Sequence, residues 1–282
     1  MAAVGADGGV RERPGSREEV AELLRRCAER GTRVRPLGGG TKSGWGSAGT
    51  EHDLELSTGG LDSILEHNEG DLTAVIEAGT PLARAQATFA EAGQMLALDP
   101  PLGEEEAATI GGVLASADSG PLRHRYGSGR DLVVGARIAL SDGTLASSGG
   151  KVIKNVAGYD LAKLMIGSFG TLGLILEVSV RLHPLPASRA TVRAVCDQPA
   201  ALGQGASALS HAHLELESLD VAWSRGAGEV LARLSGATAV EQADSARRLL
   251  AEIGLEAETV EADNELWARQ RAGQRSAGDV VV

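Results

Sequence analysis

Cysteine is almost missing from this chain, since its 282 residues include only Cys27 and Cys196. The two stand far apart in the sequence, and neither belongs to a Cys-x-x-Cys pair. The sequence therefore supports neither a disulfide framework nor a thiolate metal site. This cysteine usage fits a reducing cytoplasm.

Positive charge and long apolar runs are lacking as well. The formal net charge is −11 and no basic stripe is present, which argues against nucleic acid as a partner. No apolar run approaches the roughly 18–20 residues of a membrane-spanning helix, and residues 1–15 lack the apolar core of a secretory signal. We therefore expect a cytoplasmic protein without a membrane span of its own, so that any association with the inner membrane would come through partner subunits.

Glycine, in contrast, is abundant and unevenly distributed. Clustered glycines mark places where the backbone turns sharply or approaches a ligand closely. Any one cluster is as compatible with a flexible loop as with a binding site, but several clusters between predicted elements favour a site. The 38 glycines gather at Gly38–Gly46, Gly111–Gly120, Gly127–Gly129, Gly149–Gly158 and Gly167–Gly173.

The first two thirds of the chain mix predicted helices and strands. Ser16 and Glu19 form a capping-box pattern ahead of a helix over 16–30, and Gly31 ends it. A short strand at 32–35 leads into the first glycine loop, and Thr109 is expected to cap a short helix. The other expected elements are a strand at 73–78, a helix that Thr80 caps and Gly93 ends, a hairpin over 132–148 with a tight primed turn at Asp142-Gly143, a helix at 161–166 and a strand at 174–182.

The composition changes after Pro186, where glycine loops give way to a β-α-β-β-α-β order typical of a ferredoxin-like fold. We therefore predict an α+β protein with a first domain at 1–186 and a partial second domain at 187–282. A further helix at 264–275 and the opening of a strand at 278–282 indicate that the second domain is truncated. The six elements of the β-α-β-β-α-β order are expected at 191–195, 200–209, 219–223, 230–234, 239–253 and 256–260.

The run Gly38-Gly39-Gly40-Thr41-Lys42-Ser43 superficially resembles a mononucleotide P-loop. That motif requires glycine directly before Lys-Ser and another glycine five residues earlier, but Thr41 and Pro36 hold these positions. A Gly-x-Gly-x-x-Gly fingerprint also fails, because Ser43 stands where the third glycine belongs. A P-loop phosphotransferase is therefore disfavoured. What remains is a strand that leads into small residues whose N–H groups can converge on an anion such as a pyrophosphate.

Six segments in order resemble the vanillyl-alcohol oxidase/p-cresol methylhydroxylase superfamily of FAD enzymes. Within it, the last two segments most resemble the FAD-binding subunits of bacterial glycolate oxidases. The resemblance implies a bipartite FAD-binding domain of the p-cresol methylhydroxylase (PCMH) type, followed by a ferredoxin-like cap domain. The segments are Pro36–Ser47, Pro100-Pro101, Thr109–Gly112, Arg125-Tyr126-Gly127, Lys154–Leu161 and Gly167–Gly173.

The resemblance also implies roles for individual residues. Backbone near Ile175 would meet the flavin or the adenine. The FAD pyrophosphate would lie on Gly38, Gly39, Gly40, Thr41, Lys42 and Ser43. The ribityl chain and the isoalloxazine would be lined by Pro100, Thr109, Gly111, Gly112 and Ser116.

The attachment of FAD is expected to be noncovalent. Some members of the superfamily bind FAD through a histidine in the glycine loop, where Thr41 stands here, or through a cysteine in the second glycine segment, which neither cysteine approaches. A helix that starts after Thr109 would aim its positive end at anionic cofactor atoms.

No catalytic residue is assigned. Lys154, Arg123 and Arg125 are candidates to neutralise a reduced flavin or a substrate carboxylate, with a solvated basic loop as the alternative. His124 and His183 could be catalytic bases, because an imidazole has a pKa of about 6.5. Isolated histidines of this kind are more often surface or turn residues.

Two further polar features are given structural roles. His211 and His213 lack other ligands nearby, so no metal site is expected. Asp160 is expected to be a helix N-cap rather than an acid catalyst.

These features, with the resemblance, predict an FAD-dependent oxidoreductase subunit. Hydride would leave the carbon of a small 2-hydroxy acid such as glycolate for flavin N5, giving a 2-oxo acid. The alternative is a subunit that binds FAD for assembly or electron transfer while a homologous flavin subunit oxidises the substrate. The sequence does not separate the two, because the resemblance implies a complex of two flavin subunits and an iron–sulfur subunit. Because this chain has no cluster of cysteines, any iron–sulfur cluster would be bound by another chain.

Overall fold

The computed structural model describes residues 3–4, 10–45, 51–150 and 160–273. The chain divides into two compact units. The first unit contains residues 1–97, 102–118 and 128–184, and the second contains residues 98–101, 119–127 and 185–282. Two short segments from within the first part of the sequence therefore pack with the second unit, which the division predicted from the sequence did not include.

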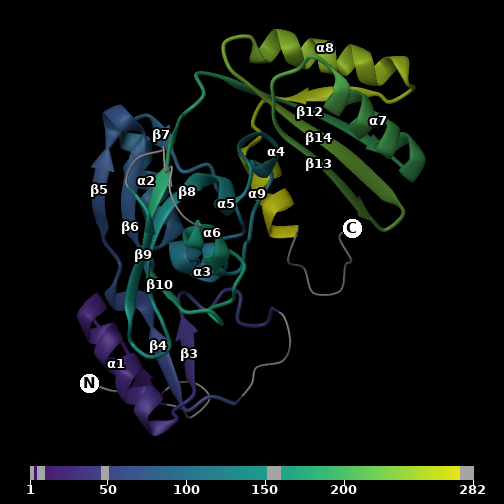
Figure 1. Cartoon of the computed structure of the whole chain (residues 1–282). Coiled ribbons are helices and arrows are strands. Elements are labelled where there is room, and N and C mark those ends of the chain that lie inside the picture. Colours follow the sequence, from purple (N-terminus) through teal and green to yellow (C-terminus); the bar gives the residue numbers. More distant parts are fainter. Residues whose placement is uncertain (1–2, 5–9, 46–50, 151–159, 274–282) are drawn as a thin grey trace. The chain divides into compact units, whose positions relative to one another are not determined.

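A small sheet and one long helix form one part of the first unit. The sheet has the order β1-β2-β4-β3, and β2 and β3 both run parallel to β4. Helix α1 (Arg17–Arg30) buries one apolar face, which includes Val20 and Leu24, in a core shared with Leu56. Figure 1 shows α1 alongside this sheet. The strands are β1 (Ala3–Val4), β2 (Val10–Glu12), β3 (Val34–Leu37) and β4 (Leu54–Ser57).

Local chemistry explains where α1 begins and ends. Ser16 Oγ accepts from the Glu19 N–H at 3.2 Å, and Gly31 has a φ of 65°, so both predicted ends are confirmed. The reciprocal bond of the capping box is displaced by one residue, because Glu19 Oε2 accepts from the N–H of Gly15 at 2.8 Å.

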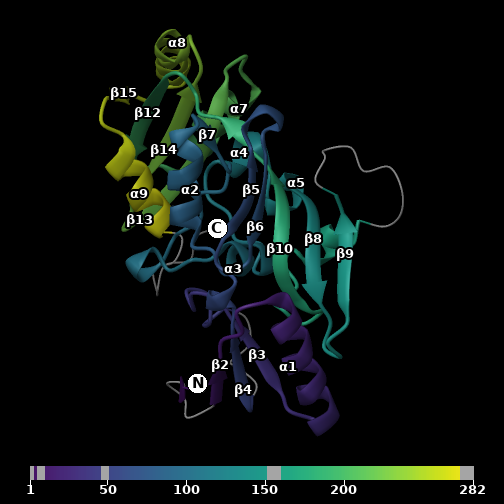
Figure 2. The ribbon, with the colours of Figure 1, turned by 90° about the vertical axis from the view of Figure 1, so that its left-hand side faces the viewer.

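A five-stranded antiparallel sheet forms the larger part of the first unit. Its order is β5-β6-β10-β8-β9, which Figure 2 shows side by side. Helix α3 contacts β6 and β10, and α6 contacts β8 and β9. The strands are β5 (Ile64–Asn68), β6 (Thr73–Glu77), β8 (Val133–Ala139), β9 (Leu145–Gly149) and β10 (Leu174–Arg181).

The remaining elements of the first unit are short. Strands β7 (Gln94–Met95) and β11 (His183–Pro184) pair with each other. Three 3-10 turns lie at Thr58–Gly60, Glu69–Asp71 and Glu104–Glu106. The helices are α2 (Leu82–Glu91), α3 (Ile110–Ala115), α5 (Gly129–Leu132) and α6 (Leu161–Met165). Helix α2 is capped by Pro81, so the expectation that Thr80 caps it is wrong. The Thr80 hydroxyl donates to the Ser63 carbonyl at 3.3 Å instead.

The hairpin β8–β9 is confirmed, but its turn differs from the expected two-residue primed turn. The N–H of Leu140 donates to the Thr144 carbonyl at 2.9 Å, which leaves three residues in the loop. Only Gly143 there has a positive φ, of 83°, whereas a type I′ turn needs positive φ at both central residues. Asp142 Oδ1 accepts from the Thr144 N–H at 2.8 Å instead, and this bond lowers the pKa of the Asp142 carboxyl.

The second unit has the predicted β-α-β-β-α-β order. Its four antiparallel strands are arranged β13-β14-β12-β15, the order of a ferredoxin-like sheet. The elements are β12 (Arg189–Cys196), α7 (Pro199–His211), β13 (Leu216–Ser224), β14 (Ala227–Ser235), α8 (Ala239–Glu252) and β15 (Ala257–Val260).

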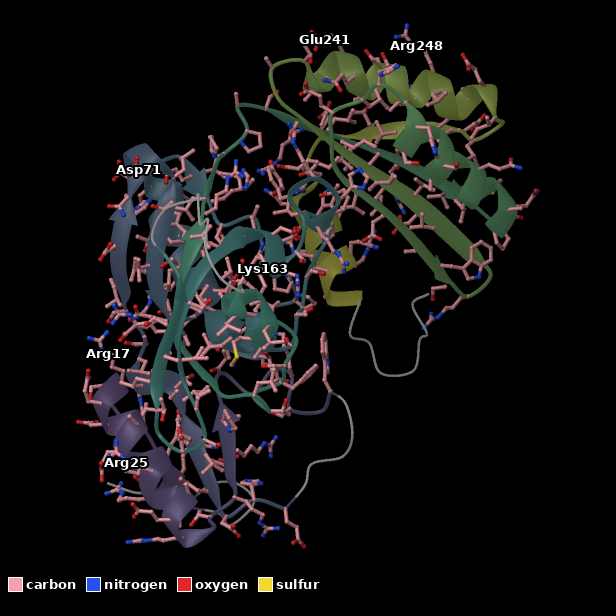
Figure 3. All side chains as sticks on the ribbon, in the orientation of Figure 1. Arg17, Arg25, Asp71, Lys163, Glu241 and Arg248 are labelled. Atoms are coloured by element: carbon pink, nitrogen blue, oxygen red, sulfur yellow. The ribbon has the colours of Figure 1, made fainter. Side chains whose placement is uncertain are left out.

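The two faces of this sheet differ in polarity. Helices α7 and α8 cover one face, over an apolar core that includes Val192, Leu202 and Leu234 (Figure 1). Exposed Glu241 and Arg248 point from α8 away from the sheet (Figure 3). The other face carries many charged side chains and is covered by α4 (Arg123–Tyr126) and the predicted α9 (Asn264–Gly273).

Three outcomes depend on how much of the chain is described. No helix within the described ranges is both long and apolar enough to cross a membrane. The strand expected at 278–282 lies outside the described residues, and so does Lys154.

Candidate functional site

The first glycine loop follows β3 directly and packs against the segment before α3. A Cβ atom on Gly38 would lie 2.3 Å from Thr109 Oγ1, and one on Gly39 would lie 1.6 Å from the Ala107 carbonyl oxygen. Both distances are far shorter than any contact a side chain makes. Only glycine allows the backbone to approach this closely, so the loop is fixed against residues 107–109 at its start.

The loop then turns at Gly40, whose φ is 72°. Both the N–H and the hydroxyl of Ser43 donate to the Gly40 carbonyl, at 3.2 and 2.8 Å. Gly39, Gly40 and Ser43 are exposed, so their backbone can meet a ligand.

Thr109 caps α3, as the sequence predicts. Its Oγ1 accepts from the Gly112 N–H at 3.2 Å, and its extended backbone begins the helix. The helix is only six residues long, so its dipole is weak and the glycine loop must supply most of any anion binding. Gly111 is buried in the first turn, against Ala78.

Ser116 ends α3, and its hydroxyl donates to the Gly112 carbonyl at 2.8 Å. The hydroxyl proton of Ser116 is therefore used in a bond to the helix backbone, and only the oxygen lone pairs are left to contact a cofactor. The next residue, Ala117, has a φ of 53°, an uncommon conformation for a residue with a Cβ.

Lys42 does not extend into solvent. Its Nζ lies 3.1 Å from Asp118 Oδ2, and the two side chains are 8% and 5% exposed. Nζ also donates to Thr41 Oγ1 at 3.2 Å. Sequence reasoning placed Lys42 in the site but missed Asp118, for which the only signal was its position inside the second glycine cluster.

The segment Gly167–Gly173 reaches the end of α3. The N–H of Gly167 donates to the Leu114 carbonyl at 3.0 Å, and that of Phe169 to the Ala115 carbonyl at 2.8 Å. Ser168 lies between them, and its buried Oγ has no hydrogen-bond partner within the described part of the chain. A buried hydroxyl of this kind calls for an external partner such as a ligand or water. Sequence reasoning included this segment but did not single out Ser168.

The structure brings most of the predicted residues of the first unit together. Gly38–Ser43, Thr109, Gly111, Gly112 and Ser116 lie in segments that contact one another. Ile175 is buried in β10 opposite Ile138, just before a register shift, so a ligand would meet its backbone rather than its side chain. Pro100 is buried and belongs to the second unit.

Two of the candidate charged residues also lie in the second unit. Arg123 and Arg125 are on α4, and Arg125 Nη1 donates to Ser235 Oγ at 3.2 Å. The Tyr126 hydroxyl donates to Glu217 Oε1 at 3.4 Å. Glu217 is fully buried and also accepts two bonds from Arg189, at 2.7 and 2.9 Å. Burial raises the pKa of the Tyr126 hydroxyl.

Asp99, in the second unit, is a carboxyl group with a strongly raised pKa. Burial raises the pKa of its carboxyl to about 7, although the Leu122 N–H donates to Oδ1 at 3.0 Å. Arg271 Nη1 lies 3.8 Å from its other oxygen. Asp99 thus belongs to a buried ionic cluster, although the sequence pattern marked only the Pro100-Pro101 pair that follows it.

Three histidines noted in the sequence lie on three different elements. His124 is exposed on α4, and His183 is in the short strand β11. His211 Nδ1 lies 2.8 Å from the Ser207 carbonyl at the end of α7. Among the described residues, no group of three or more His, Cys, Asp or Glu side chains is placed to hold a metal ion.

Asp160 caps α6, as predicted. Its side chain accepts from the Lys163 N–H at 3.4 Å, and the Lys163 ammonium lies 3.3 Å from its other oxygen. Figure 3 shows Lys163 on this short helix.

Comparison with known proteins identifies sequence relatives. Residues 10–149 match the family described as FAD binding domain. The glycolate oxidase subunit GlcD of Bacillus subtilis (strain 168) is 35% identical over 211 residues, which cover 73% of this chain and 44% of that protein. The glycolate oxidase subunit GlcE of Escherichia coli (strain K12) is 43% identical over 130 residues, which cover 46% and 37%. The mitochondrial D-2-hydroxyglutarate dehydrogenase of Bos taurus is 37% identical over 176 residues, which cover 62% and 32%. The chain spans less than half the length of each of these relatives.

Solved structures share the fold. Alkyldihydroxyacetonephosphate synthase superposes with a TM-score of 0.76 at 18% identity, covering 93% of this chain and 54% of that chain. p-Cresol methylhydroxylase with substrate bound gives a TM-score of 0.75 at 15% identity, covering 93% and 61%. The predicted α+β class with a PCMH-type FAD-binding fold is therefore confirmed.

Proposed function

Since residues 10–149 of this chain match the FAD binding domain family, we propose that the protein is an FAD-dependent 2-hydroxy-acid oxidoreductase subunit of the glycolate oxidase type. The observation that carries the proposal is the meeting of three segments, the loop Gly38–Ser43, the helix α3 and the segment Gly167–Gly173. The FAD-enzyme resemblance assigns the loop and the residues of α3 to the cofactor, and Gly167–Gly173 is one of the segments on which that resemblance rests.

The residues of this site fit FAD. The exposed backbone of Gly39 and Gly40 offers N–H donors to a pyrophosphate, and the buried hydroxyl of Ser168 has a hydrogen bond to give. Bound FAD supplies the hydride acceptor, while the chain supplies position and electrostatics. Thr109 and Ser116 fix the two ends of α3, so the backbone that would line the ribityl chain is held by side chains whose bonds are already made.

We propose that FAD is bound noncovalently. Thr41 occupies the loop position at which some superfamily members carry the attaching histidine. Cys27 is buried in α1, and Cys196 lies in the second unit. Flavin that remains with the protein after acid precipitation would contradict this part of the proposal.

The proposed substrate is a small 2-hydroxy acid such as glycolate. Relatives are named as subunits of glycolate oxidase and as dehydrogenases of D-2-hydroxyglutarate and D-lactate, which share the 2-hydroxy-acid group. Their shared chemistry supports the class of substrate, and it leaves the choice of acid to measurement.

A second candidate is an FAD-binding subunit that supports assembly or electron transfer while a homologous flavin subunit oxidises the substrate. Its support is that three cations which could bind a substrate carboxylate already have partners. Lys42 pairs with Asp118, Arg125 with Ser235 and Arg189 with Glu217. In either case we propose that the chain works with a second flavin subunit and an iron–sulfur subunit.

Anaerobic stopped-flow reduction separates the two candidates. The purified chain and its reconstituted complex are mixed with glycolate or D-lactate at matched flavin content, and flavin absorbance is followed. Rapid reduction of the chain alone supports the self-contained oxidoreductase. Reduction only in the complex supports the partner-dependent subunit, and absence of flavin from the purified chain contradicts both.

A further inference from the structure

The pair Lys42–Asp118 is the one buried ion pair next to the glycine loop among the described residues. A lysine in a phosphate-binding loop is expected to contact the phosphate directly. Here its ammonium is instead matched by a carboxylate 3.1 Å away, with both side chains almost fully buried. The pair contributes no net charge to an anion, so the loop must bind through its backbone.

The position of the pair explains what it does. The start of the loop is fixed by the close approach of Gly38 and Gly39 to residues 107–109. Lys42 lies near the end of the loop, and Asp118 follows α3, to which its N–H is tied by a 3.0 Å bond to the Val113 carbonyl. The ion pair therefore fixes the second end of the loop to the same short helix.

We propose that Asp118 is a positioning residue of the FAD site, which holds Lys42 and thereby preorganises the backbone N–H groups of Gly39 and Gly40. A loop fixed at both ends does not have to be ordered when the cofactor binds, and this raises affinity. The proposal rests on the proposed FAD-binding function. It goes beyond that function by assigning to Lys42 a structural role in place of contact with the pyrophosphate.

Removal of the Asp118 charge changes FAD affinity differently if Lys42 positions the loop than if Lys42 contacts the phosphate. Asp118→Asn keeps the shape of the side chain and removes the carboxylate that lies 3.1 Å from the buried Lys42 ammonium, which displaces the end of the loop. We expect the dissociation constant of FAD to rise by about tenfold or more, equivalent to about 1.4 kcal/mol or more. If Lys42 acts on the phosphate, loss of the competing carboxylate leaves FAD binding unchanged or tighter.

A double variant keeps the test decisive where the single variant folds poorly. Lys42→Met combined with Asp118→Leu replaces the pair by apolar side chains of similar size, a change that buried ion pairs often tolerate. A positional role predicts that this double variant binds FAD more tightly than Lys42→Met alone, because no lone charge is buried. Direct phosphate contact predicts that the two bind equally weakly.

The measurement is a titration of the full-length apoprotein with FAD, followed by flavin fluorescence at about 50 and about 300 mM salt. Circular dichroism confirms that each variant is folded. The matched control is Asp62→Asn in the same unit. It removes the carboxylate of an exposed ion pair, in which Asp62 Oδ2 lies 3.6 Å from Arg84 Nη2. We expect it to bind FAD as the unmodified chain does, and Lys42→Arg to retain most of the affinity.

The outcomes also separate this inference from the proposed function. No FAD binding by the unmodified chain contradicts the function itself. Unchanged or tighter binding by folded Asp118→Asn overturns the role of Asp118. So does a double variant that binds no better than Lys42→Met. Weaker binding by Asp118→Asn with recovery in the double variant supports it.

Discussion

The guanidinium of Arg233 lies 4.7 Å from the centre of the Trp267 ring, and both side chains are buried in the second unit. Arg233 Nε donates to Asp263 Oδ2 at 3.0 Å, and the hydroxyl of Thr191 donates to the same oxygen at 2.6 Å. The Trp267 indole N–H donates to Thr191 Oγ1 at 2.9 Å, which completes the network. These bonds hold α9 on the face of the second unit's sheet that has few apolar side chains. Polar contacts therefore stabilise the packing of α9 on this face.

Loss of Arg233 should therefore destabilise the second unit. In Arg233→Met, Asp263 loses its guanidinium while its side chain stays only 16% exposed, and the stacking on Trp267 is lost. We expect the free energy of unfolding to fall by about 2–4 kcal/mol, measured in urea by tryptophan fluorescence. Arg269→Met is the control, since that side chain is 65% exposed, and it should cost under about 1 kcal/mol. A loss for Arg233→Met no larger than the control would contradict the network's role.

Asp99 should make stability depend on pH. Burial raises its pKa to about 7 in the folded state, above the ordinary value of 3.8, so the folded chain keeps a proton that the unfolded chain has already lost. The contribution of Asp99 to the free energy of unfolding is therefore most favourable at low pH. It falls as the pH rises from about 4 to about 7 and is constant above about pH 7.

The variant Asp99→Asn isolates this effect. The amide can still accept from the Leu122 N–H and carries no charge to bury. We expect the variant to be more stable than the unmodified chain at about pH 8, by about 2–4 kcal/mol, and to lose most of this advantage near pH 4. Urea unfolding of both proteins at the two pH values provides the measurement. An advantage that is the same at both values would show that Asp99 does not titrate as proposed.

Gly39→Val should abolish FAD retention. The new Cβ would lie 1.6 Å from the Ala107 carbonyl oxygen, so the loop would have to move away from the segment that precedes α3. The matched control is Gly44→Ala, because a Cβ at Gly44 meets nothing within 4 Å. The ratio of flavin absorbance to protein absorbance after gel filtration is the measurement. Equal flavin content in the two variants would remove the loop from the site.

Ala117→Gly should stabilise the first unit. Ala117 has a φ of 53°, which costs a residue with a Cβ more than it costs glycine. We expect a gain of about 0.5–1 kcal/mol in the free energy of unfolding, less than the full strain because glycine also gives the unfolded chain more freedom. Ala115→Gly, two residues earlier within α3, should instead lose about 1 kcal/mol. Thermal melting of the two variants compares them, and a shift in the same direction for both would argue against strain at Ala117.

Acid precipitation tests the mode of cofactor attachment. Because no histidine or cysteine is placed for a covalent bond in the described residues of the loop, the flavin should appear in the supernatant. Absorbance of the supernatant and of the redissolved pellet gives the ratio. Flavin colour in the pellet after washing would indicate a covalent bond.

The sequence was sufficient where a local rule decides the structure. Ser16 and Gly31 bound α1 through hydrogen bonds and a left-handed φ that can be predicted from residue type. Thr109 and Asp160 cap their helices for the same reason. The order of the second unit followed from alternating apolar patterns, because each element must bury one face.

The sequence was insufficient where distant segments decide. Nothing near Lys42 indicates that its charge is matched by Asp118, and the Asp142-Gly143 pair is as compatible with the observed three-residue loop as with the expected primed turn. The residues of α4 look like part of the glycine-rich first region. Their packing with the second unit depends on Glu217 and Ser235, which follow them by about a hundred positions.

The path of the chain through its two units limits how the protein can be dissected. The backbone passes from one unit to the other at 97/98, 101/102, 118/119, 127/128 and 184/185. A protease that cuts once near residue 185 would therefore divide the second unit, since Asp99 and Tyr126 would stay with the N-terminal fragment while Arg271 and Glu217 stayed with the other. The two fragments would each carry buried polar groups without their partners. The second unit thus draws two short segments from the N-terminal region, and a gene chimaera that replaced the C-terminal part would have to replace these two segments as well.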